Sequence, residues 1–509
     1  MAASLQSHLS GIARSGTANL LGAAIAAVLN FGVIIVVTQL FPQQTAGSLF
    51  SLTSVFVIAL AVCSLGTDVG LSRFLLRYRS LGRQQDMSAL VSAARTPVLL
   101  CAVLVALVGV ACSGQIAGML GFGGRDAALA VAVLMLLLPF AALGDFSLAA
   151  ARGLGTFRST VLSEKLLRPV LQPLGALVVS LAGGGLVWLT ASWAVPYVIA
   201  AVLALVLMEK AFAAYRTPRS MYAPRLSQVR REFWSFTWPR ALARISQAVI
   251  QRADIVIVAA LLGPSPAAVY TAATRFVALG QFGVNAIVQV LQPRFSQLLA
   301  EGERKTLETV FKTTTSWNMA VAWPLYVIAF AGADFYLTVF GEGYATQPAR
   351  LVVWVMALAM MLATAAGPLD TMLLMSGYSA TSLVISLTGL ALNIGLCFAL
   401  IPVLQLPGAA LAWAVAIVVR NLLTFLAVRS KLGLVPWGRS AALVGSAAVV
   451  CFGLPLLPVV LAGSASFPAF SAAIGVGLVL YVLVLLTLRR PLQLQAFARL
   501  LPSTRAREA

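Results

Sequence analysis

The chain has 509 residues, of which 60% are hydrophobic and only 10% are charged. A soluble domain needs more polar surface than this, so the composition excludes soluble enzymes, secreted modules and disordered tails and indicates a membrane protein. The 35 Lys and Arg residues against 15 Asp and Glu would suggest a nucleic-acid partner in a soluble protein, but here membrane orientation is the first explanation to test.

Apolar runs of about 20 residues, the length of a helix that crosses a bilayer, recur between polar or glycine-rich breaks. They predict an all-α polytopic membrane protein with roughly fourteen transmembrane helices. The first six lie near residues 17–40, 46–66, 89–112, 127–150, 161–182 and 186–209. The next six lie near 239–262, 267–292, 310–340, 348–375, 379–402 and 408–428, and a final pair lies near 440–461 and 467–488.

The longest polar stretch, residues 210–238, follows the sixth predicted helix and carries six basic residues. We expect it to be a cytoplasmic linker between two pseudo-symmetric six-helix halves, residues 1–209 and 239–430. Residues 431–509 would then add two helices and a basic cytoplasmic tail. Transporters often consist of two such repeats that move about a central site, so this organisation favours transport.

The predicted loops differ sharply in their content of Lys and Arg. One side receives 25 basic residues, whereas the other side receives only Arg125 and Arg350. Because loops rich in Lys and Arg stay in the cytoplasm, both termini are predicted to be cytoplasmic. Orientation accounts for most of the basic excess, and no nucleic-acid partner is expected.

Four arginines cluster on the first two helices of the second half: Arg240, Arg244, Arg252 and Arg275. An Arg near the bilayer centre costs ~2.5 to 3.5 kcal/mol, so such side chains usually face a bundle interior, a water-filled cavity or a partner. Guanidinium groups bind phosphate through paired hydrogen bonds, and a cavity lined by them would suit a diphosphate or an acidic sugar. For Arg252, a structural ion pair with Asp254 is an equal alternative.

Acidic residues in or near the spans are candidates for binding a proton or a sodium ion that drives transport. Asp145, Asp254 and Asp370 have the most apolar flanks and come first. The alternative is that these carboxylates are counter-ions to arginines or lie at helix ends.

The usual residues of soluble catalytic sites are largely missing. There is one histidine, His8, and no GxxxxGK[ST] phosphate loop. The five cysteines lie in apolar runs without CxxC spacing, which indicates core residues rather than a metal site. The predicted external loops are short and leave little scaffold for catalysis. We therefore expect a protein that is not an enzyme and that needs no cofactor or metal apart from a coupling H⁺ or Na⁺.

Residues 251–298 resemble the seventh and eighth helices of bacterial oligosaccharide flippases, the polysaccharide-exporter branch of the MATE-like MOP superfamily. That family carries Arg-x-Asp, a short turn, Tyr-x-x-Ala-x-Arg and then Pro-x-x-Ser. The matching residues here are Arg252 and Asp254, then Tyr270, Ala273 and Arg275, then Pro293 and Ser296. Residues 64–78 and 391–416 also agree with the family, whereas Ala267 and Ala268 replace its frequent Val-Gly.

The resemblance implies that the protein moves undecaprenyl-diphosphate-linked oligosaccharide from the cytoplasmic to the outer leaflet of the bacterial inner membrane by alternating access. The product would serve surface or exopolysaccharide assembly, with membrane lipids, a polysaccharide polymerase and assembly proteins as partners. Lipid II flippases share the Arg275 position, but of their basic residues in helix one only Arg14 is available here.

Two alternatives stay open at this point. One is an ion-coupled multidrug exporter, and the other, from a different class, is a membrane glycosyltransferase or polymerase. A predominantly cationic cavity favours an anionic lipid head over cationic drugs.

Overall fold

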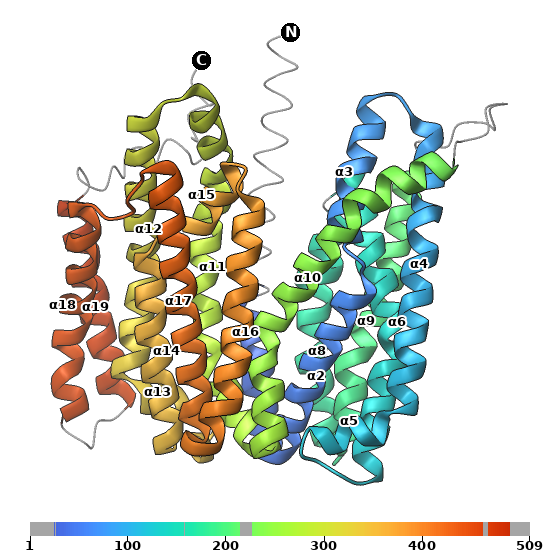
Figure 1. Cartoon of the computed structure of the whole chain (residues 1–509). Coiled ribbons are helices and arrows are strands. Elements are labelled where there is room, and N and C mark those ends of the chain that lie inside the picture. Colours follow the sequence, from blue (N-terminus) through green and yellow to red (C-terminus); the bar gives the residue numbers. More distant parts are fainter. Residues whose placement is uncertain (1–24, 26, 157, 214–225, 462–466, 489–509) are drawn as a thin grey trace, which may run out of the picture. The chain divides into compact units, whose positions relative to one another are not determined.

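The computed structural model describes residue 25 and residues 27–156, 158–213, 226–461 and 467–488, and within these ranges it contains helices and no strand (Figure 1). Eleven helices in the described ranges are long and apolar enough to span a membrane, and Ala27–Leu40 is a shorter apolar helix. The two remaining predicted spans, 161–182 and 310–340, also fall on helices. The prediction of an all-α polytopic membrane protein is therefore confirmed.

By packing, the chain divides into two compact units, Met1–Thr271 and Ala272–Ala509. The first unit takes in α10 (Leu226–Leu262), because this helix packs against the helices that precede it. The boundary between the units falls inside α11 (Pro264–Glu301) and not in the polar stretch 210–238. Of that stretch, residues 214–225 lie outside the described residues, and residues 226–238 form the first part of α10. The division into two repeats of six helices stays a prediction.

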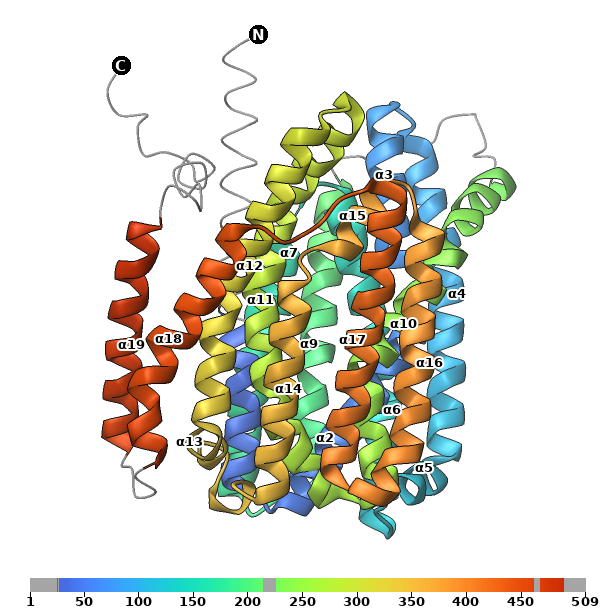
Figure 2. The ribbon, with the colours of Figure 1, turned by 60° about the vertical axis from the view of Figure 1, so that its left-hand side comes forward.

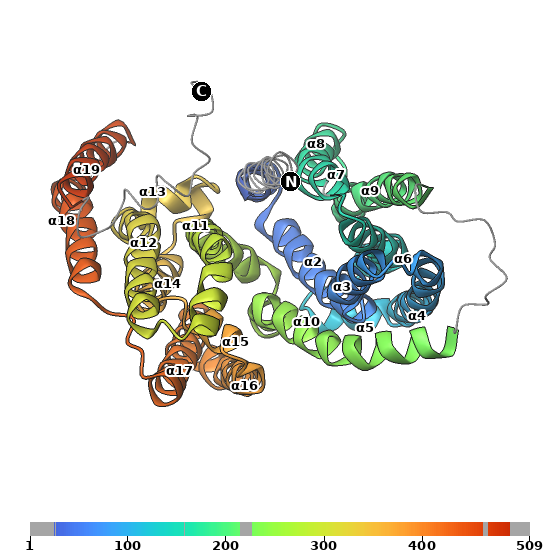
Figure 3. The same cartoon turned by 90° about the horizontal axis from the view of Figure 1, so that it is seen from above.

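The first unit is a helix bundle around α6 (Arg125–Gly153). Figure 3 shows α6 beside α3, α4 and α9, which all pack against it. Small side chains line this helix, and Ala149, Ala150 and Ala151 are fully buried, which allows close helix approach. The other elements are α2 (Gln43–Cys63), α3 (Thr67–Ser80), α4 (Gln84–Ala111), α5 (Ser113–Met119), α7 (Arg158–Thr160), η1 (Val161–Leu167), α8 (Arg168–Leu181) and α9 (Leu186–Ala213).

Two irregular segments interrupt the first unit. Between α2 and α3 the chain turns at Leu65, with φ 48°, and Gly66, with φ 72°. A Cβ atom on Gly66 would lie 2.6 Å from the amide nitrogen of Ala241 on α10, so both the backbone conformation and the close packing require glycine. The second irregular segment is η1, a π-helical turn, and such turns are frequent at functional sites.

The second unit contains the rest of α11 and the C-terminal helices. Figure 2 shows α18 beside α19, and α18 also packs on α12. Phe452, Phe470 and Tyr481 form a buried cluster there, and the Tyr481 hydroxyl donates to the carbonyl of Ala320 at 3.1 Å. The elements are α12 (Arg304–Ala331), α13 (Ala333–Thr338), η2 (Glu342–Tyr344), α14 (Gln347–Ala365), α15 (Leu369–Met375), α16 (Ser379–Leu404), α17 (Leu406–Leu432), α18 (Arg439–Leu461) and α19 (Phe467–Thr487).

A tyrosine hydroxyl lies against the backbone of α11 where the second unit begins. Tyr336 of α13 donates to the carbonyl of Ala272 at 2.6 Å and accepts from the amide of Phe276 at 3.2 Å. These two backbone groups, four residues apart, bond to each other in a regular α-helix. α11 stays helical through this turn, and the two hydrogen bonds of the Tyr336 hydroxyl attach α13 to it.

Candidate functional site

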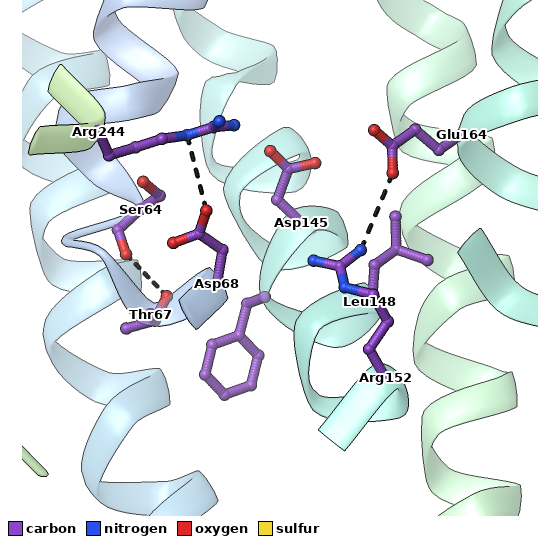
Figure 4. A pocket seen from close by; sticks show the side chains of 9 residues that line it. Ser64, Thr67, Asp68, Asp145, Leu148, Arg152, Glu164 and Arg244 are labelled. Carbon is purple, nitrogen blue, oxygen red and sulfur yellow. Dashed lines mark hydrogen bonds and ion pairs between the residues drawn. The ribbon is translucent and has the colours of Figure 1, made fainter. Parts of the chain in front are cut away.

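A polar cavity of about 200 Å³ lies inside the first unit. Its walls come from four parts of the chain: α6, the break between α2 and α3, η1 and α10 (Figure 4). Three acids and two arginines meet there although the surrounding helices are apolar. The lining residues are Ser64, Thr67, Asp68, Asp145, Phe146, Leu148, Arg152, Glu164 and Arg244.

The break between α2 and α3 forms one wall of the cavity. The Ser64 hydroxyl donates to the carbonyl of Ala61 at 2.8 Å, and the Thr67 hydroxyl donates to the carbonyl of Ser64 at 2.7 Å. These bonds satisfy carbonyl groups that the break removes from the regular helix, which is how broken helices are tolerated in a membrane. Asp68 follows in the first turn of α3, where the helix dipole favours a negative charge.

Arg244 reaches the same wall from α10. Its Nε atom lies 3.7 Å from Oδ2 of Asp68, and the two side chains are 51% and 26% exposed. This pair therefore joins α10 to α3 while the arginine remains accessible from the cavity.

The π-helical turn η1 brings Glu164 to the opposite wall. The Glu164 carboxylate lies 3.9 Å from Nη1 of Arg152 and 3.9 Å from Nη2 of Arg168. The Arg168 guanidinium also stacks over the Tyr197 ring, 4.6 Å from its centroid, which is favourable for a cation in an apolar bundle. Glu164 thus links α6 to α8.

Asp145 lies between these two charged groups (Figure 4). Its carboxylate forms no hydrogen bond or ion pair with any residue that the structure describes, although the charges of Arg168, Arg244 and Arg152 act on it. A half-buried carboxylate that faces a polar cavity inside a membrane bundle is a suitable group for taking up a proton or a cation.

The cavity brings together two of the residues predicted from the sequence, Arg244 and Asp145. Arg240 is exposed and lies over the Phe236 ring, 5.6 Å from its centroid, outside the cavity lining. Arg14 lies outside the described residues.

Asp254 has a partner other than Arg252. The Tyr270 hydroxyl donates to Oδ2 of Asp254 at 3.0 Å, and both side chains are buried. Arg252 is half-buried on the same helix, α10. The link from Tyr270 fastens the beginning of α11 to α10.

The two remaining predicted residues belong to the second unit. Arg275 is half-buried on α11, directly before Phe276, whose amide donates to Tyr336. Asp370 of α15 accepts a hydrogen bond from the Ser382 hydroxyl at 2.5 Å, so this carboxylate has a polar partner on α16.

Sequence reasoning gave less weight to four residues that the structure places in or beside the cavity: Asp68, Arg152, Glu164 and Arg168. Arg152 falls just after the predicted span 127–150, and Arg168 lies in the first half of the predicted span 161–182. Two signals could have found them. The spacing of Glu164 and Arg168 is that of an ion pair within a helix, and the Ser-Leu-Gly-Thr-Asp run is typical of a break.

Two family models match the sequence. The model described as polysaccharide biosynthesis protein covers residues 12–299, more than half of the chain, and the MatE model covers residues 239–399. No curated protein matches the sequence.

Solved structures show where the fold occurs. The lipid II flippase MurJ, in an inward closed conformation, has a TM-score of 0.69 at 12% identity, covering 94% of this chain and 99% of that chain. An inward-facing multidrug resistance MATE family transporter of the MOP superfamily has a TM-score of 0.66 at 15% identity, covering 80% and 94%. A MOP superfamily transporter from Pyrococcus furiosus has a TM-score of 0.58 at 16% identity, covering 83% and 96%.

At these identities the solved structures establish the fold alone, whereas the family model establishes the family. The helical architecture and the apolar spans agree with this family and this fold. The chain is a multi-pass membrane protein of the polysaccharide biosynthesis protein family, with the fold of the MOP superfamily transporters.

Proposed function

We propose that the protein is a flippase that moves an undecaprenyl-diphosphate-linked oligosaccharide from the cytoplasmic to the outer leaflet of the inner membrane by alternating access. Surface or exopolysaccharide assembly would consume the product. The family match supports this proposal, and so does the fold shared with a lipid II flippase. The observation that carries it is the cavity of the first unit, where Arg152 and Arg244, together with three carboxylates, face a polar space inside an apolar bundle.

The ion pairs of the cavity leave its arginines able to bind an anion. The distances of 3.7 Å for Arg244 to Asp68 and 3.9 Å for Arg152 to Glu164 are longer than the ~2.7 to 2.9 Å of a strong charge-assisted hydrogen bond. Their guanidinium groups can therefore turn to a diphosphate, which accepts paired hydrogen bonds. The carboxylates and hydroxyls of Asp68, Glu164 and Ser64 supply acceptors and donors for sugar hydroxyl groups.

The four other basic residues predicted from the sequence stay candidates for contacts with the substrate. They are Arg14, Arg240, Arg252 and Arg275. The last two are half-buried on α10 and α11, helices long and apolar enough to span a membrane, where an arginine is retained at a cost and therefore usually serves a partner.

We assign the coupling of transport to H⁺ or Na⁺ first to Asp145. Asp254 and Asp370 each accept a hydrogen bond from a side chain, Tyr270 and Ser382, whereas Asp145 faces the cavity. A proton or cation on Asp145 would change the charge of the cavity beside Arg244, which links ion binding to anion binding.

The test is a reconstituted flipping assay. Purified protein in proteoliposomes receives a fluorescent undecaprenyl-diphosphate oligosaccharide, and its accessibility on the opposite leaflet is followed with time. We expect Arg152→Gln to slow transfer, and Arg429→Gln, a substitution on an exposed arginine of α17, to leave transfer unchanged. Transfer at the wild-type rate by a folded Arg152→Gln protein would contradict the assignment of the cavity.

The second candidate function is an ion-coupled multidrug exporter. The MATE neighbour and the MatE model favour it, and so do the three carboxylates Asp68, Asp145 and Glu164, which suit a cationic drug. Efflux of a cationic dye, together with no transfer of the lipid-linked oligosaccharide, would establish this function in place of the flippase.

A further inference from the structure

A second hollow of the first unit is a groove of about 620 Å³ between α4 and the beginning of α10. Figure 3 shows α10 running beside α4, and the two helices pack together. The residues of the groove that matter here are Leu65, Pro97, Arg230, Arg231, Trp234 and Trp238. Two arginines thus stand next to two tryptophans on one helix.

The sequence of α10 explains this arrangement. Val229, Phe233 and Thr237 recur every four residues and are buried against the bundle. The neighbouring stripe, Arg230 and then Trp234 and Trp238 at the same spacing, therefore lies at the edge of the buried face. Trp238 is 58% exposed and both arginines are exposed, so the groove is accessible from outside the first unit.

We propose that this groove binds the headgroup of an anionic phospholipid from the surrounding bilayer. Tryptophan is enriched at the level of the headgroups, and basic residues near the membrane surface attract anionic lipids. No carboxylate is among the lining residues of the groove in the described part of the chain. The two guanidinium groups hold the phosphate, and the indole rings and Pro97 pack against the upper part of the acyl chains.

The groove meets the inner cavity at the break between α2 and α3. Leu65 lines the groove, whereas its neighbour Ser64 lines the cavity together with Thr67 and Asp68. Leu65 has φ 48°, a conformation that only contacts from its surroundings can maintain. A lipid packed against Leu65 supports this conformation and with it the position of Asp68 opposite Arg244. The lipid site is thus a support for the cavity.

Binding is tested without any transport measurement, so its outcome is independent of the proposed flippase activity. The full chain is placed in nanodiscs of phosphatidylcholine alone or of an equal mixture with phosphatidylglycerol. The two readouts are the phosphatidylglycerol molecules retained in native mass spectrometry and the shift in Tm between the two bilayers.

We expect wild-type protein to retain phosphatidylglycerol over phosphatidylcholine and to melt at a higher temperature in the mixed bilayer. The double variant Arg230→Gln/Arg231→Gln should lose one retained lipid and most of the Tm shift, and Trp238→Ala should weaken retention while keeping the charge. The matched control is Arg304→Gln/Lys305→Gln, an exposed basic pair at the start of α12, which should behave as wild type.

Two results would overturn the proposal. One is equal retention of phosphatidylglycerol by the Arg230/Arg231 variant and by wild type. The other is an equal loss in the control pair, since a general attraction between basic residues and anionic lipid would then explain retention without a site.

Discussion

Exchanging the charges of Arg244 and Asp68 separates two roles for Arg244, which either holds α10 to α3 or binds the anionic substrate. The double variant Asp68→Arg/Arg244→Asp keeps an ion pair between the two helices. It removes the guanidinium group from the α10 position and places it on α3. A purely structural pair should tolerate this exchange, whereas a phosphate-binding arginine should not.

The structure allows the cost to stability to be worked out. Two unit charges 3.7 Å apart attract by ~4.5 kcal/mol at an effective dielectric of about 20. Because the Arg244 side chain is 51% exposed, solvent screens the pair to ~0.2 to 1 kcal/mol. Replacing the carboxylate at the N-terminus of α3 adds ~0.3 to 1 kcal/mol. Even if the exchanged pair regained none of its attraction, the free energy of unfolding should fall by no more than about 2 kcal/mol.

The expected cost to transport is larger. Hydrogen bonds to a charged group are worth ~1.5 to 3 kcal/mol, which corresponds to a roughly 10- to 150-fold slower transfer. The assay compares Arg244→Gln, Asp68→Asn and the exchanged pair in the reconstituted flipping system, with Tm measured on the same preparations. Recovery of wild-type transfer by the exchanged pair would show that Arg244 is structural and would refute its assignment to the substrate.

Four further predictions follow from the sequence and the structure. Reporter fusions within 210–238 and at the C-terminus should report a cytoplasmic location, and an external signal would refute the orientation. Asp145→Asn should abolish the response of transfer to an imposed pH or Na⁺ gradient at unchanged protein abundance, whereas an unaltered response would exclude coupling there. Tyr270→Phe removes the 3.0 Å bond to buried Asp254 and should lower the free energy of unfolding by ~1.5 to 3 kcal/mol in chemical denaturation. Gly66→Ala places a Cβ atom at a positive φ and in close contact with α10, so the free energy of unfolding should fall as for an overpacked core, by ~1 to 3 kcal/mol in chemical denaturation.

The spans were predictable because each needs only a local property, about 20 apolar residues between polar breaks. The cavity was harder to predict because its pairs join distant parts of the chain. Nothing near Asp68 in the sequence indicates that Arg244 of α10 will approach it, and the link between Glu164 and Arg152 depends on a π-helical turn with no clear sequence signature. Asp145 was found because its apolar flanks alone placed an acid inside a helix.

The sequence also did not show how far into the helix bundle a charged residue lies. Arg152 lies in the last turn of α6, beside glycines that suggest a loop, yet it lines the cavity. A window of apolar residues indicates where a helix ends. It does not indicate whether the bundle contains polar space beside that helix end. Only the packing of α6 against its neighbours shows that polar space extends to Arg152.

The hydroxyl of Tyr336 contacts the backbone of α11 without interrupting the helix, unlike a proline. Proline bends a helix permanently, because it has no amide hydrogen to form the backbone hydrogen bond to the residue four positions earlier. At Ala272 and Phe276 both backbone groups are intact, and a hydroxyl bridges them. If Tyr336 withdraws, the carbonyl and the amide can still serve each other, because they stand four residues apart in a continuous helix. The hydroxyl alone then needs a new partner in hydrocarbon, so the free-energy cost of the movement falls on α13 and not on the backbone of α11.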